Sequence, residues 1–156
     1  MTHRVLFVCL GNICRSPLAE AAFRAEAERI GLDAEADSAG TGGWHRGEAP
    51  DRRAIAAARR NGIDISGLRA RQVPPEDFER FDHVIALDRD NLSNLRDLQP
   101  AGSRARLSLL LDHVPGREGA AVADPYYGDD SDFDITWRDV SEGARALAEE
   151  LQREEV

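Results

Sequence analysis

The stretch Val5-Leu6-Phe7-Val8-Cys9-Leu10-Gly11-Asn12-Ile13-Cys14-Arg15-Ser16-Pro17 decides the fold of this chain. Its first five residues are continuously apolar, as expected for a strand that is covered on both faces in a parallel sheet. Gly11-Asn12 is expected to turn the chain. Ser16 is suited to cap a helix, and Pro17 to occupy the first helical position, where a missing N–H costs nothing. The stretch therefore predicts a strand, a loop and a helix in succession.

The same alternation continues to the end of the chain. Helices are predicted over 18–30, 51–60, 75–80, 89–98 and 132–154, further strands over 32–37, 83–87 and 106–111, and a loop over 38–43. Strands that alternate with helices indicate an α/β fold: a doubly wound, four-stranded parallel sheet with helices on both faces. No repeat or linker divides the 156 residues, a length that suits one core, so 1–156 is expected to be a single domain.

Composition indicates a globular protein, since 42% of the residues are hydrophobic and 31% are charged. The longest apolar runs, 5–10 and 107–111, are far shorter than the roughly 20 residues of a membrane span. The first run is also too short for a secretory signal. We therefore expect a cytoplasmic protein without a membrane partner.

Charge and residue types exclude several function classes. The formal net charge of −9 disfavours nucleic acid as a partner. Every basic residue is arginine, so a nucleotide-binding P-loop, which requires lysine, is excluded. The two cysteines and four histidines have no zinc-ligand spacing, and we expect no metal and no cofactor. The acidic run 129–134 fails as a calcium loop, because Ile135 replaces the turn glycine and Ser141 the bidentate glutamate.

Cys9 lies where a doubly wound sheet binds its ligands, at the carboxyl end of a strand. Five residues separate it from Arg15, enough to wrap once around a tetrahedral anion. Backbone N–H groups and the N-terminus of the following helix would attract that anion, and the guanidinium of Arg15 would bind two of its oxygens. The same positive electrostatic potential would favour a nucleophilic thiolate at Cys9. Gly11 is expected to supply the backbone inversion, and Ser16 a hydrogen bond to the sulfur. The alternative is an inert buried cysteine beside a surface arginine. The predicted phosphate-binding residues are Leu10, Gly11, Asn12, Ile13, Cys14, Arg15 and Ser16.

The stretch from Val8 to Pro17 resembles the signature loop of the low-molecular-weight protein tyrosine phosphatases. Further landmarks of that family are matched in its order, by Ser38-Ala39-Gly40-Thr41 with Trp44, Leu87-Asp88 with Asn91, and Asp124-Pro125-Tyr126-Tyr127-Gly128. The resemblance implies a hydrolase of phosphotyrosine that acts through a phosphocysteine without metal or cofactor. Cys9 would be the nucleophile, Arg15 the phosphate ligand and Asp124 the general acid.

The resemblance also suggests supporting roles. Trp44, Tyr126 and Tyr127 would form the wall of the substrate pocket, although a lone tryptophan is as often packed in a core. Ser38, Asp88 and Asn91 would support the loop, although Asp88 and Asn91 could simply cap a helix. Cys14 would be a redox partner of Cys9 or a passive small side chain. Leu68 stands where many relatives place a histidine that tethers the loop asparagine, so that tether is in question.

Three other functions compete. A protein arginine phosphatase of the same fold tends to carry threonine where Ile13 stands and has a smaller aromatic wall. A thiol-dependent arsenate reductase needs further cysteines, and none follows Cys14. A phosphoprotein-binding module would be expected to lose the nucleophile or the acid. The expected partners are phosphotyrosine-bearing proteins, including a tyrosine kinase, and the expected state is a monomer with a weak dimer possible.

Overall fold

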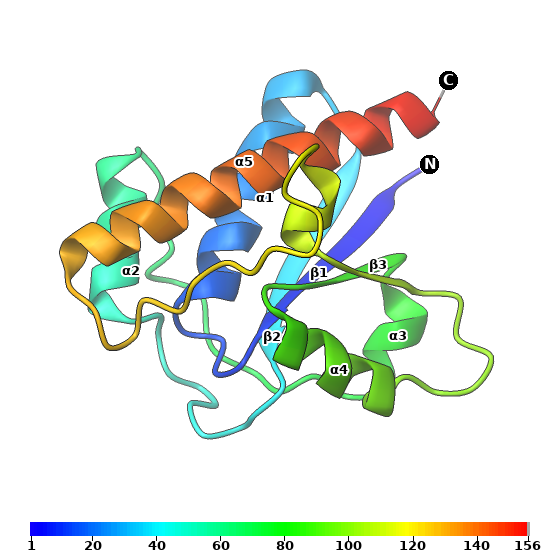
Figure 1. The fold of residues 1–156 in the computed structure, drawn as a ribbon, viewed down its shortest axis with the longest axis horizontal. Coiled ribbons are helices and arrows are strands. Elements are labelled where there is room, and N and C mark those ends of the chain that lie inside the picture. Colours follow the sequence, from blue (N-terminus) through cyan, green and yellow to red (C-terminus); the bar gives the residue numbers. More distant parts are fainter. Residues whose placement is uncertain (156) are drawn as a thin grey trace.

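A computed structural model describes residues 1–155. Its core is one sheet of four parallel strands in the order β2-β1-β3-β4 (Figure 1). The strands are β1 (His3–Cys9), β2 (Ala34–Gly40), β3 (His83–Ala86) and β4 (Arg106–Leu109). The helices are α1 (Arg15–Ile30), α2 (Arg52–Arg60), α3 (Asp77–Arg80), α4 (Arg89–Leu98), the short 3-10 helix η1 (Leu110–His113) and α5 (Asp130–Glu154). The predicted doubly wound, single-domain architecture is confirmed.

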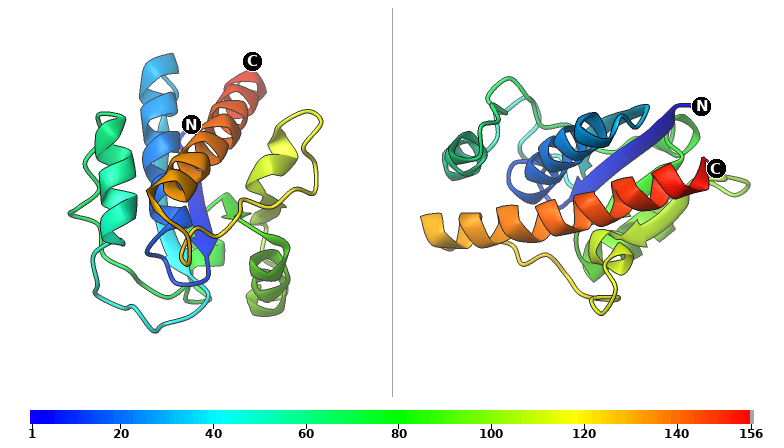
Figure 2. Two further views of the ribbon diagram at one scale, coloured as in Figure 1. Left: turned by 60° about the vertical axis from the view of Figure 1, so that its left-hand side comes forward. Right: turned by 90° about the horizontal axis from the view of Figure 1, so that it is seen from above.

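The continuous apolar run of β1 is explained by two separate cores. Val5 and Phe7 face the core formed with α1, α2 and α5, whereas Leu6 and Val8 face the core formed with α3 and α4. Figure 2 shows α1, α2 and α5 gathered on one side of the strands and α4 on the other. Because successive side chains of a strand point to opposite faces, a strand between two helical layers needs apolar residues at every position.

The strand order places a topological switch point beside β1. From β1 the chain pairs first with β2 on one side and then with β3 on the other, so the connections that leave the carboxyl ends of β1 and β3 diverge. Open α/β sheets bind ligands in the crevice at such a point. The segment between β1 and α1 opens there.

Several element boundaries differ from the prediction. The second strand extends through Ser38 to Gly40, because these residues pair with Phe7 to Cys9 of β1, so the expected loop begins three residues later. The fourth strand ends at Leu109, and η1 begins at the next residue, Leu110. α5 begins at Asp130, because the side chain of Asp129 accepts hydrogen bonds from the N–H groups of Ser131 and Asp132.

The predicted helix cap at Ser16 is wrong. α1 begins at Arg15 with Cys14 as its N-cap, which makes Pro17 the third helical residue. Proline is tolerated there because the N–H groups of the first turn have no intrahelical acceptor. The hydroxyl of Ser16 is instead engaged within the loop that precedes the helix, as described below.

Among residues 1–155, no helix combines the length and the apolar character that crossing a membrane would demand. In the same residues, no three His, Cys, Asp or Glu side chains are grouped so that they could hold a metal ion.

Candidate active site

Cys9 is the last residue of β1, and its buried thiol is contacted by two polar groups of the following loop. The Ser16 hydroxyl lies 3.1 Å from the Cys9 Sγ, and the backbone N–H of Asn12 donates to the same sulfur at 3.3 Å. The sulfur also lies close to the N-terminus of α1, where the helix dipole favours negative charge. These contacts would stabilise a thiolate at Cys9.

The loop presents a set of unengaged backbone donors. Among the described residues, no protein group accepts a hydrogen bond from the loop N–H groups of Gly11, Ile13, Cys14, Arg15 and Ser16. A run of free N–H groups at the start of a helix is an anion-binding arrangement. The five donors belong to five of the seven residues that were predicted to bind phosphate.

The backbone inversion occurs at Asn12, with φ of 60°, and not at Gly11 as predicted. Asparagine tolerates this left-handed conformation better than other residues with a side chain. Here its side chain also holds the conformation by hydrogen bonding, whereas glycine could not.

Arg15 is only 4% exposed, so the alternative in which it is a surface arginine is wrong. Its Nη1 donates to Asp88 Oδ2 at 2.7 Å and to the carbonyl oxygen of Val122 at 3.0 Å. Burial alone lowers the pKa of Arg15, but the charge of Cys9 and the hydrogen bond to Asp88 outweigh it and raise the pKa above its ordinary value. A positive charge is thus fixed beside the sulfur.

Asp124 reaches the same place from the segment before α5. Its Oδ2 lies 3.7 Å from Arg15 Nη2, and its Oδ1 accepts the N–H of Tyr126 at 3.1 Å, which orients the carboxyl group. Cys9, Arg15 and Asp124 all border one cavity of about 260 Å³. It is lined by Cys9, Leu10, Gly11, Ile13, Cys14, Arg15, Trp44, His45, Asp124, Tyr126 and Tyr127.

The aromatic residues form the rim of this cavity. Trp44 is 71% exposed and Tyr127 is 96% exposed, so the alternative of a core tryptophan is wrong. The rings of Tyr126 and Tyr127 meet edge to face with their centres 5.0 Å apart. Flat apolar surfaces at the mouth of an anion site suit an aromatic ester.

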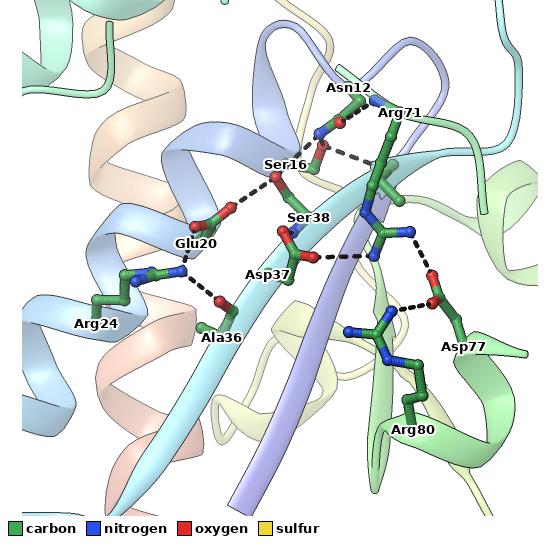
Figure 3. A network of polar contacts seen from close by, with 11 residues as sticks. Asn12, Ser16, Glu20, Arg24, Ala36, Asp37, Ser38, Arg71, Asp77 and Arg80 are labelled. Carbon is green, nitrogen blue, oxygen red and sulfur yellow. Dashed lines mark hydrogen bonds and ion pairs between the residues drawn. The ribbon is translucent and has the colours of Figure 1, made fainter. Parts of the chain in front are cut away.

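Asn12 is held from three directions (Figure 3). Its Nδ2 donates to Ser16 Oγ at 2.8 Å and to Ser38 Oγ at 3.0 Å, and its Oδ1 accepts the backbone N–H of Arg71 at 3.0 Å. Leu68 packs against the apolar core instead. The tether that the missing histidine put in question is therefore supplied by the main chain at Arg71.

The network continues into α1 through the buried Glu20. Ser38 Oγ donates to Glu20 Oε1 at 2.8 Å, and Arg24 lies 2.8 Å from Glu20 Oε2. Burial raises the pKa of Glu20, while the hydrogen bond from Ser38 and the charge of Arg24 oppose that shift. The loop asparagine is thus linked through Ser38 to a side chain one helical turn beyond Ser16.

Gly40 allows β2 to approach the loop closely. A Cβ added to Gly40 would lie 2.7 Å from the carbonyl oxygen of Leu10 and 3.1 Å from the carbonyl carbon of Gly11. Both contacts involve backbone atoms, which no side-chain rotation could relieve. The neighbouring N–H groups of Thr41 and Gly42 donate to the carbonyls of Cys9 and Leu10, so the same approach anchors the loop.

The two predicted supports on the β3 side differ in what they contact. Asp88 pairs with Arg15 and also caps α4 by accepting the N–H of Asn91 at 2.7 Å. The Asn91 side chain is not hydrogen-bonded to the loop, and its buried Oδ1 has no hydrogen-bond partner among the described residues. Asp88 combines both of the roles considered from the sequence.

Several functional contacts were missed from the sequence. Arg53 donates to the carbonyls of Tyr126 and Gly128, and thereby holds the segment that bears Asp124. Glu20, His45 and Val122 were also missed. Only His45 could have been found from the sequence, because it directly follows Trp44, a predicted pocket residue. Arg53, Glu20 and Val122 act through backbone carbonyls or through contacts between elements that are far apart in the sequence.

The fold and the site define a class of protein: a doubly wound α/β domain in which a cysteine, an arginine and a carboxyl group converge on one anion-binding cavity. Within that class, the chain belongs to the family described as low molecular weight phosphotyrosine protein phosphatase, whose family model matches residues 4–156. The predicted resemblance is confirmed.

Three relatives illustrate the match. A low molecular weight phosphotyrosine protein phosphatase of Schizosaccharomyces pombe is 47% identical over 133 residues, covering 83% of this chain and 85% of that protein. The crystal structure of YfkJ from Bacillus subtilis matches with a TM-score of 0.92 at 41% identity, covering 100% of this chain and 98% of that one. The YwlE arginine phosphatase structure, a mutant with a phosphorylated active-site serine, matches with a TM-score of 0.87 at 29% identity, covering 96% of each chain.

Proposed function

We propose that this protein is a protein tyrosine phosphatase that hydrolyses phosphotyrosine through a phosphocysteine at Cys9. The observation that carries the proposal is the convergence of Cys9, Arg15 and Asp124 on one cavity with an aromatic rim. Family membership supports the same conclusion, because relatives across bacteria, fungi and animals are named as phosphotyrosine phosphatases.

The reaction would proceed in two steps. In the first, the Cys9 thiolate attacks phosphorus, the bond from phosphorus to the tyrosyl oxygen breaks, and Asp124 gives its proton to the departing phenolate. In the second, the Asp124 carboxylate takes a proton from water, the water attacks the phosphocysteine, and the thiolate and inorganic phosphate are released. The loop N–H groups and Arg15 would stabilise the negative oxygens in both steps.

A protein arginine phosphatase is the second candidate, because the YwlE arginine phosphatase shares the fold. Ile13 and the paired tyrosines at the rim favour the aryl ester, since they present apolar surface to an aromatic ring. We expect kcat/KM for a phosphotyrosine peptide to exceed that for the matched phosphoarginine peptide by at least about tenfold, which corresponds to roughly 1.4 kcal/mol of transition-state stabilisation. Phosphate release from both peptides in the presence of a chelator would measure it, and a preference for phosphoarginine would reverse the assignment.

We also propose that Cys14 forms a reversible disulfide with Cys9. Peroxide would oxidise the Cys9 thiolate to a sulfenic acid, and the Cys14 sulfur would then displace water to form the disulfide. Both cysteines line the same cavity, which supports the pairing. Burial, and then the charge of Asp51, raise the pKa of the Cys14 thiol well above its ordinary value, so the second step is expected to be slow at neutral pH and faster as pH rises.

The disulfide is tested by peroxide treatment followed by a thiol reductant. Wild-type protein is expected to recover its activity. The Cys14→Ser variant should be inactivated irreversibly, because its Cys9 sulfenic acid has no neighbouring thiol to trap it and further peroxide oxidises it to the sulfinic acid, which a thiol reductant does not reverse. Mass spectrometry of the oxidised wild type should find the Cys9–Cys14 linkage. Equal recovery of the two proteins would contradict the proposal and leave Cys14 a passive side chain.

Phosphotyrosine-bearing proteins are the partners that this function requires, and a tyrosine kinase would be one of them. A cytoplasmic location and a monomer with a weak dimer remain predictions from the sequence. Sedimentation at several protein concentrations would test the oligomeric state, and a stable dimer at low concentration would contradict it.

A further inference from the structure

One of the three hydrogen bonds of Asn12 comes from Arg71, whose own side chain is held by a carboxylate of α3 (Figure 3). Arg71 Nη1 donates to Asp77 Oδ2 at 2.7 Å. Arg71 Nη2 lies 3.1 Å from Asp37 Oδ2, but without the geometry of a hydrogen bond, and Arg71 Nε has no acceptor among the described residues. Asp77 is therefore the group that sets the direction of the Arg71 guanidinium.

Asp77 is a fixed point in the structure. It is fully buried as the first residue of α3, and the next residue, Phe78, packs in the core formed with α3 and α4. A buried carboxylate is costly unless a cation pairs with it. Arg71 provides that pairing on one oxygen, and the exposed Arg80 lies 3.5 Å from the other. Burial and pairing together keep the carboxylate in place.

This contact joins the phosphate-binding loop to the second helical layer of the fold. Asp37 of β2 is paired in register with Leu6, which faces the core formed with α3 and α4. Ser38 points to the opposite face, because successive side chains of a strand alternate, and there it contacts α1. Asn12 is therefore held from both layers, through Ser38 on the side of α1 and through Arg71 on the side of α3.

The contact also lies only two hydrogen bonds away from the reacting sulfur. The backbone N–H of Arg71 donates to Asn12 Oδ1, and the backbone N–H of Asn12 donates to Cys9 Sγ. The main chain of Arg71 is attached to β2 as well, because its carbonyl oxygen accepts the N–H of Gly40 at 2.8 Å. Loss of the Asp77 carboxylate would leave Arg71 with that backbone attachment but without its attachment to α3.

We propose that Asp77 is a positioning residue of the active site, which fixes Asn12 through Arg71 and thereby fixes the loop that binds phosphate. Asp77 itself lies outside the lining of the cavity. The inference rests on the proposed function and deepens it, since it concerns the loop of the same site. Without the Asp77 charge, Asn12 would be held less firmly, and the loop N–H groups would be aligned less well with the phosphate oxygens.

The test is calorimetric titration of the Asp77→Asn variant with inorganic phosphate. We expect the Kd for phosphate to rise about fivefold at unchanged stoichiometry, and kcat/KM for a phosphotyrosine peptide to fall by a similar factor. A merely structural role predicts a different pattern. Part of the protein would be unfolded, so the stoichiometry would fall while the Kd of the folded molecules stayed the same. An unchanged Kd would overturn the proposal.

Two further variants separate the effect of Asp77 on Arg71 from a general effect on α3. Arg80→Gln removes the other arginine that contacts Asp77, and should change the Kd by less than about twofold, because exposed ion pairs contribute little. The double variant Asp77→Asn/Arg71→Gln removes both charges of the pair, so it leaves no buried charge without a partner and tests the proposal even where Asp77→Asn does not fold. It should show the same fivefold rise in Kd. An equal rise in the Arg80→Gln variant would overturn the proposal.

Coupling to Asn12 tests the route through which Asp77 acts. Asn12→Gly removes the amide, while glycine still adopts the left-handed conformation of the loop. In the Asn12→Gly background, Asp77→Asn should raise the Kd by less than about twofold, because the contact that transmits its effect is already absent. A full additional fivefold rise would contradict an action through Asn12.

Phosphate binding requires no turnover, so failure of the proposed function is distinguishable from failure of this inference. Wild-type protein that binds phosphate but does not hydrolyse a phosphotyrosine peptide would contradict the proposed function, and the comparison of Kd values would still decide the role of Asp77. Wild-type protein that hydrolyses the peptide, with the same Kd as its Asp77→Asn variant, would contradict this inference alone.

Discussion

Replacement of Cys9 by serine is expected to abolish hydrolysis of phosphotyrosine, with a loss of at least about a thousandfold in kcat, because a serine hydroxyl does not provide the thiolate nucleophile. The buried site, the loop N–H groups and Arg15 would remain in place. Phosphate should therefore still bind. Steady-state hydrolysis and calorimetric titration with inorganic phosphate would measure the two properties separately.

The matched control for this substitution lies in the same loop. Cys14→Ser makes the same atomic change within the cavity, but removes no side chain that the proposed reaction uses, so this variant should continue to turn over. Substantial hydrolysis by the Cys9→Ser variant would refute the assignment of the nucleophile. Loss of phosphate binding together with turnover would indicate that the loop had collapsed.

Replacement of Asp124 by alanine is expected to have the second largest effect, and its size should depend on the leaving group. A positioned general acid contributes about 10²- to 10⁴-fold, and it contributes most where the departing oxygen is most basic. The tyrosyl oxygen is more basic than that of p-nitrophenol. The loss in kcat should therefore be large for phosphotyrosine and smaller for p-nitrophenyl phosphate.

The second substrate serves as the control within the same variant. Equal losses on both substrates would contradict a role in protonating the leaving group and would indicate that Asp124 acts mainly by positioning Arg15, which lies 3.7 Å away. Because Asp124 is on the rim and not in the loop, the variant should still capture phosphotyrosine proteins. A pull-down with this variant would identify the physiological substrates.

The architecture was predictable from the sequence because the apolar residues of β1 run without interruption from Val5 to Cys9. Apolar side chains on both faces require two covering layers, and Val5 to Val8 are fully buried in the two cores. The place of Cys9 followed from the same strand, since it ends where the sheet binds ligands. The element boundaries were harder, because Ser38 to Gly40 extend β2 through pairing with β1 and not through any β propensity of their own.

The contacts that shape the loop were largely hidden from the sequence. Gly11 was the natural candidate for the backbone inversion, yet Asn12 adopts it, because its amide gains three hydrogen bonds there. One of these hydrogen bonds is donated by the backbone N–H of Arg71. Every residue except proline has such a donor, so the sequence does not indicate which one is used. Glu20 was equally hidden, since a glutamate within a helix is ordinary until the fold places Ser38 against it.

The clamping of Asn12 from α1, β2 and the segment at Arg71 has an energetic consequence for catalysis. The left-handed turn is imposed when the chain folds, so its conformational entropy is surrendered then and not on encounter with substrate. A phosphate dianion would therefore bind N–H donors that are already oriented, and the loop would lose little further conformational entropy on binding. Affinity for the transition state would thus depend on the stability of the contacts that hold the loop. A substitution at Glu20, which does not contact the phosphate, would lower the reaction rate by making the loop more mobile.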